Sequence, residues 1–209
     1  MEKVFTYGNP EAATVLIQMA DDRDLEMMEK EAAEIQRLTD QDFCLTVLGV
    51  ARWNHDLSPW EAPALFGKES FGNGAPATLR EALKHTSDCD RHYYIGGYSL
   101  AGLFALWAVY QTDAFEGAAA VSPSIWFPGF TDYMTGNEIR CKCVYLSLGD
   151  REERTKNPIM STVGERIREA HRLLEGRTVR TALEWNQGNH FKDAEIRTAR
   201  GFAWLMNQR

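Results

Sequence analysis

Ser99, His190 and an acidic group around Glu152 are the side chains of this chain whose types suit nucleophilic catalysis. Ser99 stands in GYSLAG at 97–102, a G-x-S-x-A-G segment in which small residues flank the serine. A free serine hydroxyl is a weak nucleophile, so it needs a histidine within hydrogen-bond reach as general base. A carboxylate that holds the imidazole completes such a set.

Five histidines compete for the role of base. His85 and His171 fall inside predicted helices, and His92 begins the strand that leads to the serine, so all three are expected to be structural. His190, in NQGNHF, follows the last predicted strand and precedes the last predicted helix. We therefore expect His190 to be the base, with His55, in an earlier loop on the same side, as the less favoured alternative.

The acid should come from SLGDREER at 147–154, which offers three carboxylates. Any of them could accept the second imidazole N–H if it were aimed correctly. The spacing favours Glu152, three residues past the glycine, and Asp150 is the close alternative. If this segment is only a solvated loop paired with its own arginines, the serine and the histidine would act as a dyad.

Strands and helices alternate along the chain and must position these residues. Nearly continuous apolar runs at 14–19 and 43–50 predict strands that are covered on both faces. Apolar residues three and four apart predict an amphipathic helix over 25–38, which Asp24 is placed to cap. Further strands are expected over 92–97, 117–122, 141–149 and 177–185, and further helices over 75–85, 100–111, 159–174 and 193–206.

This alternation predicts the α/β class, with a mostly parallel sheet and helices on both faces. Ligands bind beyond the carboxyl ends of such strands, which is where the serine, the acidic group and the histidine fall. Their order, serine then acid then histidine, is the order of an α/β-hydrolase fold. We expect one domain over 1–209, with no large cap domain and hence a rather open site.

Four segments within 94–191, namely GGYSLAG, SPSIWF, LGDRE and GNHF, resemble an esterase family of α/β-hydrolases. That family includes enterochelin-type siderophore esterases and S-formylglutathione hydrolases, and SPSIWF is the most family-specific segment. The resemblance implies Ser99 as nucleophile, His190 as base and Glu152 as acid, although some siderophore esterases use only a Ser-His pair. It implies a serine hydrolase that cleaves a carboxylic ester or thioester through an acyl-enzyme on Ser99, without a cofactor.

The oxyanion hole departs from the family pattern. One donor is expected to be the backbone N–H of Leu100, next to the nucleophile, and the second should follow the strand at 14–19. Many relatives have a His-Gly-Gly type segment there, whereas this chain has QMADDRD. A backbone N–H near Ala20 or Asp21 is the expected substitute. Capping a helix is the simpler role for Asp21 and Asp22, and we predict no metal site.

Aromatic residues in loops at the predicted catalytic side suggest an apolar wall for the substrate. Trp53 and Trp126 are the expected pocket residues, with Trp60 and Phe127 nearby. The four cysteines are expected to be buried or half-buried free thiols.

The net charge of −7 provides no broad basic surface, which argues against nucleic acid or an anionic membrane as partner. No segment is apolar for long enough to be a secretory signal or a membrane span, so we expect a cytoplasmic protein that acts on a small molecule. The oligomeric state is not encoded in any visible pattern.

Two alternatives use the same fold. An acyltransferase would pass the acyl group to an alcohol or amine with the same residues. A catalytically inactive hydrolase-fold binding module would explain the missing glycine-rich segment and Ala101, which stands where the usual motif has glycine.

Overall fold

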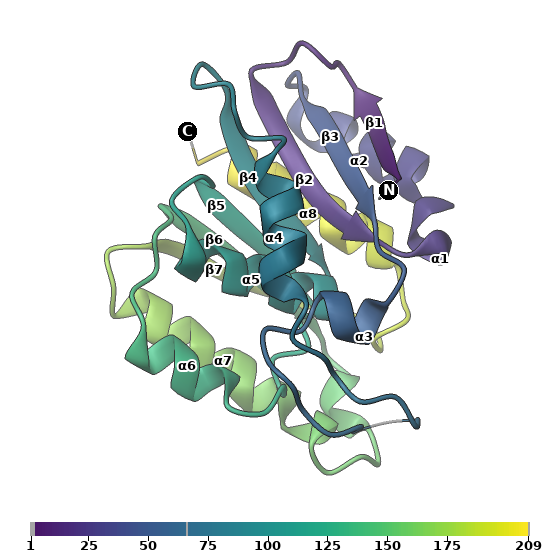
Figure 1. Ribbon diagram of the computed structural model, residues 1–209, viewed down its shortest axis with the longest axis vertical. Coiled ribbons are helices and arrows are strands. Elements are labelled where there is room, and N and C mark those ends of the chain that lie inside the picture. The colour runs from purple at the N-terminus through teal and green to yellow at the C-terminus, as the bar shows by residue number, and fades with distance from the viewer. Residues whose placement is uncertain (1–2, 66, 209) are drawn as a thin grey trace.

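A seven-stranded sheet in the order β1-β3-β2-β4-β5-β6-β7 forms the centre of the computed structural model, which describes residues 3–65 and 67–208 (Figure 1). β1 runs antiparallel to β3. Every other neighbouring pair is parallel, in agreement with the mostly parallel sheet that the sequence predicts. The strands are β1 (Val4–Gly8), β2 (Thr14–Ala20), β3 (Cys44–Gly49), β4 (His92–Tyr98), β5 (Gly117–Val121), β6 (Cys143–Gly149) and β7 (Arg180–Asn186).

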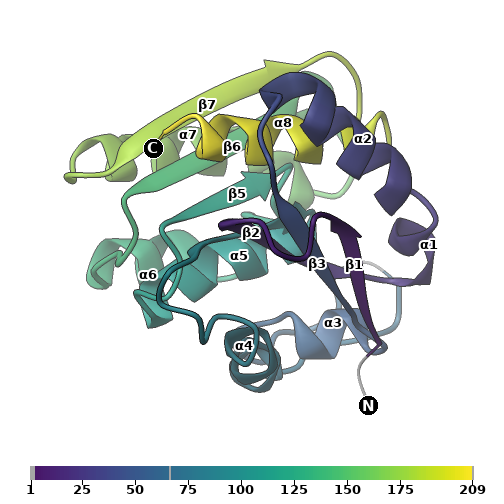
Figure 2. The ribbon, with the colours of Figure 1, turned by 90° about the horizontal axis from the view of Figure 1, so that it is seen from above.

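Helices cover both faces of the sheet. α2 (Met28–Thr39) and α8 (Ala194–Met206) share one buried cluster with the strands. α4 (Ala75–Leu83), α5 (Leu100–Gln111), α6 (Phe130–Gly136) and α7 (Val163–Glu175) contribute to the cluster on the other face. Figure 2 shows α2 and α8 on one side of the strands and α4, α5 and α6 on the other. Short elements complete the fold: α1 (Asp22–Leu25), α3 (Trp53–Asp56), and the 3-10 turns η1 (Glu152–Arg154) and η2 (Met160–Thr162).

Small residues let α8 approach the middle of the sheet. A Cβ at Gly96 of β4 would lie 2.6 Å from the Phe202 ring, and one at Gly201 would lie 3.0 Å from Ala119 of β5. No larger side chain fits between this helix and these strands without displacement. The close contact fixes α8 over β4 and β5, and thereby fixes Arg197, one turn before Gly201.

The N-terminal elements differ from the sequence prediction. The single helix expected over 25–38 is two helices, α1 and α2, with a break at 26–27. Asp24 lies in the first turn of α1 and is not its cap. Asp21 is the cap, because its carboxylate accepts the N–H groups of Arg23 and Asp24 at 2.8 and 2.9 Å. β1 was not predicted from its sequence.

The cysteines and the β6 boundary also differ in part. β6 begins at Cys143, so Cys141 precedes the strand, but the two thiols still belong to the clusters on opposite faces. Cys44 is buried as well. Cys89 is exposed, which contradicts the expectation for this residue.

The connection between α3 and α4 is the longest excursion near the carboxyl ends of the first strands. Its described residues contain one isolated bridge, between Ala62 and Phe71, and they form no separate cap domain, as predicted. Within the described ranges, no helix combines the length and apolar character needed to cross a bilayer.

Candidate active site

Ser99 occupies a sharp turn between β4 and α5. Its φ of 57° and ψ of −120° lie outside the usual regions for a residue with a side chain. A Cβ at Gly97 would lie 2.7 Å from the Ala101 Cβ, and a Cβ at Gly102 would lie 2.8 Å from the Gly97 carbonyl oxygen. Glycine is therefore required at both positions for the turn to close, whereas the Ala101 methyl group fits, 1% exposed, beside Gly97.

Ser99, His190 and Glu152 form one continuous line of hydrogen bonds. Ser99 Oγ lies 3.0 Å from His190 Nε2, and His190 Nδ1 lies 2.7 Å from Glu152 Oε2. The three residues follow β4, β7 and β6, so the carboxyl ends of three parallel strands deliver them to one place. This is the geometry in which a histidine can take the serine proton while a carboxylate fixes the imidazole.

Asp150, the alternative acid, has a different contact. Its Oδ1 accepts the backbone N–H of Gly188 at 2.8 Å, two residues before His190. Glu152 is the carboxylate that reaches the imidazole. Asp150 instead ties the loop after β7 to the loop after β6.

Glu152 is buried among hydrogen-bond donors. Its side chain is 4% exposed, and its Oε1 accepts from Ser122 Oγ at 2.7 Å and Gly149 N–H at 2.8 Å. Arg197 Nη1 lies 3.3 Å from the same oxygen, and the Arg197 side chain is 3% exposed. Taking a carboxylate out of water is costly unless donors replace the lost hydration, and here they do.

Arg197 and Tyr98 support the back of the site. Arg197 donates to the Tyr98 hydroxyl at 3.1 Å and to the Gln187 carbonyl at 3.1 Å, while the Tyr98 hydroxyl donates to the His190 carbonyl at 2.8 Å. Burial, followed by the nearby Glu152 charge, raises the pKa of Tyr98 to about 12, so the phenol keeps its proton. Tyr98 can therefore act as a donor at any ordinary pH.

Sequence reasoning missed both of these residues. Arg197 offered a signal, since it lies four and eight positions before Gly201 and Leu205 on the buried side of α8. A charged side chain on such a face must find a buried partner. The role of Tyr98 depends on a backbone carbonyl remote in sequence and gave no signal.

The SPSIWF segment contributes two serines to the site. Ser122 has a φ of +41° and donates its hydroxyl to Glu152. Ser124 donates its N–H to the Ser99 carbonyl at 3.0 Å, and its hydroxyl lies 3.4 Å from Ser99 Oγ. Sequence analysis singled out this segment but gave neither serine a role.

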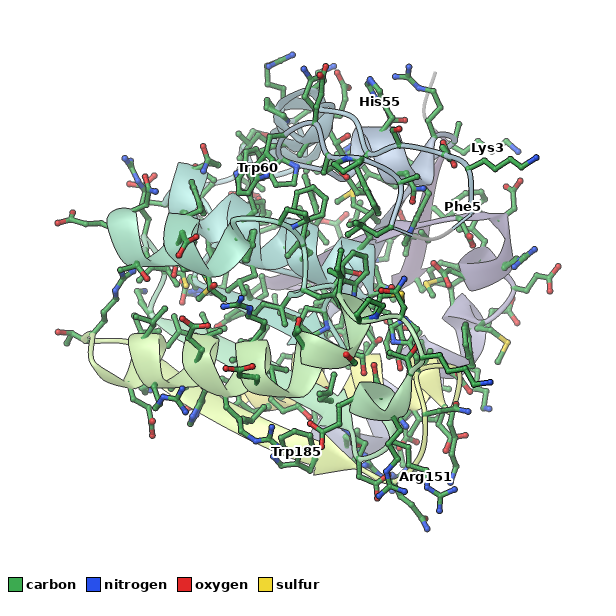
Figure 3. The ribbon with its side chains drawn as sticks, turned by 90° about the horizontal axis from the view of Figure 1, so that it is seen from below. Lys3, Phe5, His55, Trp60, Arg151 and Trp185 are labelled. Carbon is green, nitrogen blue, oxygen red and sulfur yellow. The ribbon has the colours of Figure 1, made fainter. Side chains whose placement is uncertain are left out.

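The other histidines lie outside this arrangement. His55 is part of α3, with Nδ1 2.9 Å from Asp56, and Figure 3 places it on the opposite side of the view from Arg151. His92 contacts Glu116 at the start of β4, at 2.6 Å. His171 contacts Glu175 within α7 at 3.4 Å. The structure thus brings His190, and not His55, to Ser99.

The two predicted oxyanion donors have different surroundings. Leu100 is the first residue of α5, where an N–H has no acceptor within the helix, and it lines the same cleft as Ser99. Asp21 does not line that cleft. Its N–H faces Asp24 Oδ2 at 3.4 Å, within the cap of α1, and the residue borders a separate cavity of about 580 Å³. Asp21 thus caps α1, the simpler role expected for it, and its use as an oxyanion donor stays a prediction.

A cleft of about 740 Å³ opens over Ser99. The residues that line it include Trp53 and Trp126, together with Phe71, Met160 and Phe191. Trp60 and Phe127 do not line it. They pack against each other with ring centroids 5.7 Å apart, and Trp60 also stacks on Phe130.

One group of residues within the described ranges brings together three His, Cys, Asp or Glu side chains at a spacing that could suit a metal ion. It is the turn at 88–90, Asp88, Cys89 and Asp90, which is fully exposed and not part of the cleft. Exposed acidic groups of this kind commonly hold no ion, so we assign it no role.

Comparisons with known proteins establish the fold. No protein-family model matches the chain, and no curated protein matches it in sequence. An IroE-like serine hydrolase from Shewanella oneidensis superposes with a TM-score of 0.77 at 13% identity, over 99% of this chain and 76% of that one. The siderophore hydrolase EstA from Aspergillus nidulans gives 0.70 at 15% identity, over 99% and 94%.

The enterobactin esterase FES from Shigella flexneri gives a TM-score of 0.69 at 13% identity, over 99% of this chain and 56% of that chain. The chain therefore has the α/β-hydrolase fold, as predicted. At such low identities the likeness extends to the fold, and the chemistry must be argued from the residues of this chain.

Proposed function

We propose that this protein is a serine hydrolase that cleaves a carboxylic ester or thioester through an acyl-enzyme on Ser99. The observation that carries the proposal is the line from Ser99 Oγ to His190 Nε2 to Glu152 Oε2, with distances of 3.0 and 2.7 Å. The strained backbone of Ser99 supports it, because strain of this kind is seldom retained without a function.

In the first half of the reaction, Ser99 Oγ attacks the acyl carbon while His190 Nε2 takes the hydroxyl proton. Glu152 accepts the Nδ1–H hydrogen bond and stabilises the imidazolium. The Leu100 N–H donates to the oxyanion of the tetrahedral intermediate. His190 then gives its proton to the leaving group, at the oxygen of an alcohol or the sulfur of a thiol. The departure of this group leaves Ser99 acylated.

In the second half, His190 takes a proton from a water molecule, which attacks the acyl carbon and releases the carboxylic acid. The proton returns to Ser99 Oγ. The apolar wall of Trp53, Phe71 and Trp126 suits the uncharged part of an acyl or alcohol group. The three solved structures named above are a serine hydrolase, a siderophore hydrolase and an enterobactin esterase. Their activities favour ester chemistry for this chain too.

A fluorophosphonate probe tests the nucleophile directly. The wild-type protein should be labelled, Ser99→Ala should not, and the exposed control Ser87→Ala should be labelled like the wild type. Hydrolysis of p-nitrophenyl butyrate should fall by about 10³-fold or more in Ser99→Ala. Equal labelling of the wild type and Ser99→Ala would refute the proposal and favour an inactive binding module.

Product analysis separates hydrolysis from acyl transfer. With an ester substrate and no added acceptor, the proposal predicts the free carboxylic acid as the main product. If turnover requires an alcohol or amine and yields its acyl derivative, the enzyme is an acyltransferase that uses the same Ser99 and His190.

A further inference from the structure

Cationic side chains gather at the cleft over Ser99. Arg23, Arg151 and Arg154 all line it, and all three are exposed. Among the described residues, none of the three guanidinium groups forms an ion pair. This concentration of positive charge contrasts with the net charge of −7 of the whole chain.

The acids closest in sequence to Arg151 and Arg154 have other partners. Asp150 accepts from the Gly188 backbone, and Glu152 binds His190 and Arg197. Glu153 pairs with Arg168 of α7 at 3.4 Å. The carboxylates of the segment at 150–154 are therefore engaged elsewhere, and its two arginines line the cleft with no ion pair among the described residues.

Arg23 has a different environment. It also borders the neighbouring cavity, which Asp21, Asp22 and Asp56 line, so carboxylates offset part of its charge. On the other side of the cleft the positive character continues, because Arg151 also lines a smaller cavity of about 340 Å³ together with Lys192 and Asn189. Figure 3, viewed from the side where the parallel strands end, shows the exposed position of Arg151.

We propose that Arg151 and Arg154 select an ester or thioester that carries a fixed anion, a carboxylate or a phosphate, beside the bond to be cleaved. Guanidinium groups match the planar carboxylate and the phosphate through paired N–H donors. The apolar wall of the cleft takes the uncharged part of the substrate, and the anion sits at its cationic edge. This inference rests on the proposed serine hydrolase function and adds the class of substrate.

Matched substrate pairs test the inference. One pair is 4-acetoxybenzoate and its methyl ester, which differ in a carboxylate on the leaving group. A second is the monoester of adipic acid with p-nitrophenol and its methyl ester, with the carboxylate on the acyl group. A third is the butyryl thioester of 4′-phosphopantetheine and that of pantetheine, which differ in one phosphate on the leaving group. The pair with the largest preference for the charged member identifies the anion and its position.

The proposal predicts that kcat/KM for the charged member exceeds that for the neutral one by about 10-fold or more in at least one pair, mainly through a lower KM. Arg151→Gln with Arg154→Gln should reduce that ratio by about 10-fold, and salt should reduce it in the wild type. The control Arg172→Gln removes an exposed arginine of α7 that lies outside the cleft and forms no ion pair with any described residue, and it should leave the ratio unchanged.

Each result decides one of the two proposals. Ser99-dependent hydrolysis with equal kcat/KM within every pair, or a ratio unaffected by the double variant, would overturn the charge selection and leave the serine hydrolase standing. If probe labelling of Ser99 occurs without turnover of any pair, protection of Ser99 against the probe replaces turnover as the measurement. Adipate should then protect better than dimethyl adipate, and equal protection would overturn the inference.

Discussion

Two buried glutamates, Glu152 and Glu31, have opposite surroundings. Glu152 faces four donors, from Ser122, Gly149, Arg197 and His190. Glu31, a residue of α2 that is 1% exposed, receives one long hydrogen bond from Gln18 at 3.4 Å. Within the described part of the chain, its Oε1 and the Gln18 Oε1 have no hydrogen-bond partner.

Glu152 is a buried carboxylate with several hydrogen-bond donors around it, whereas Glu31 is buried almost without donors. Burial raises the pKa of Glu31 well above its ordinary value. The hydrogen bond from Gln18 lowers this pKa by less, and the charges of Asp24 and Glu195 add smaller increases. Protonated Glu31 could donate to the free Gln18 oxygen. Burial by itself therefore gives a neutral acid, and a carboxylate that is to hold a histidine needs donors around it.

Among the substitutions that test the different roles of the two glutamates, Glu152→Gln should have the largest effect. The amide keeps the shape but loses the charge that holds the imidazolium, so kcat should fall by about 10³-fold. Asp150→Asn, the control, can still accept from Gly188 and should lose less than about 10-fold. Steady-state kinetics with a p-nitrophenyl ester measure both, and a larger loss for Asp150→Asn would reverse the assignment of the acid.

Arg197→Met should lower the free energy of unfolding by about 3 kcal/mol, because it leaves Glu152 buried without its guanidinium. Arg200, on the exposed side of the same helix, pairs with Glu184 at 3.4 Å. Arg200→Met should cost less than about 1 kcal/mol. Urea unfolding measures both values, and equal costs would mean that the buried pair contributes no more than the exposed one.

Glu31→Gln should raise the free energy of unfolding, in contrast to Arg197→Met, and so stabilise the protein. Since folding raises the pKa of Glu31, the wild type loses stability as the pH rises from the ordinary value of a glutamate through the folded value. The variant avoids that loss, and its amide can pair with both polar atoms of Gln18. We expect a gain of about 1–2 kcal/mol in urea unfolding near pH 8. The gain should shrink towards about pH 4, and a destabilised variant at high pH would contradict the assignment.

Ser122→Ala should give the smallest effect, a fall in kcat of about 5-fold to 10-fold, because it removes one of the donors to Glu152. Ser147→Ala is the matched control, since Ser147 is also fully buried and its hydroxyl is not among the donors to Glu152. That control should leave kcat unchanged. Equal kcat values for wild type and Ser122→Ala would remove Ser122 from the support of the site.

Much of the fold follows from local patterns. The apolar runs of β2 and β3 and the small residues of β5 predicted a buried parallel sheet, because such strands must be covered on both faces. β1 escaped prediction since an edge strand is half exposed, and its residues alternate between exposed and half-buried positions without a strong apolar pattern. The break between α1 and α2 was hidden because apolar spacing continued across it.

The candidate site was predictable where position along the chain was enough. The turn of Ser99, the loop of His190 and the acidic segment each follow a strand, and parallel strands bring such positions together. The surroundings of Asp21 could not be predicted, because its position in the sequence does not reveal that its N–H faces Asp24. Only spatial contacts identify Arg197 as the partner of Glu152.

The loop that bears His190 is tied down at three separate points. Gly188 is bonded to Asp150, Gln187 to Arg197, and the His190 carbonyl to the Tyr98 hydroxyl. Tyr98 adjoins Ser99 in sequence, so the loop is anchored to the strand end that carries the serine. Freeing the imidazole would require these bonds to break together, which makes opening of the loop a rare cooperative event. The Gly188 amide should accordingly exchange its hydrogen with solvent on the slow timescale of the sheet.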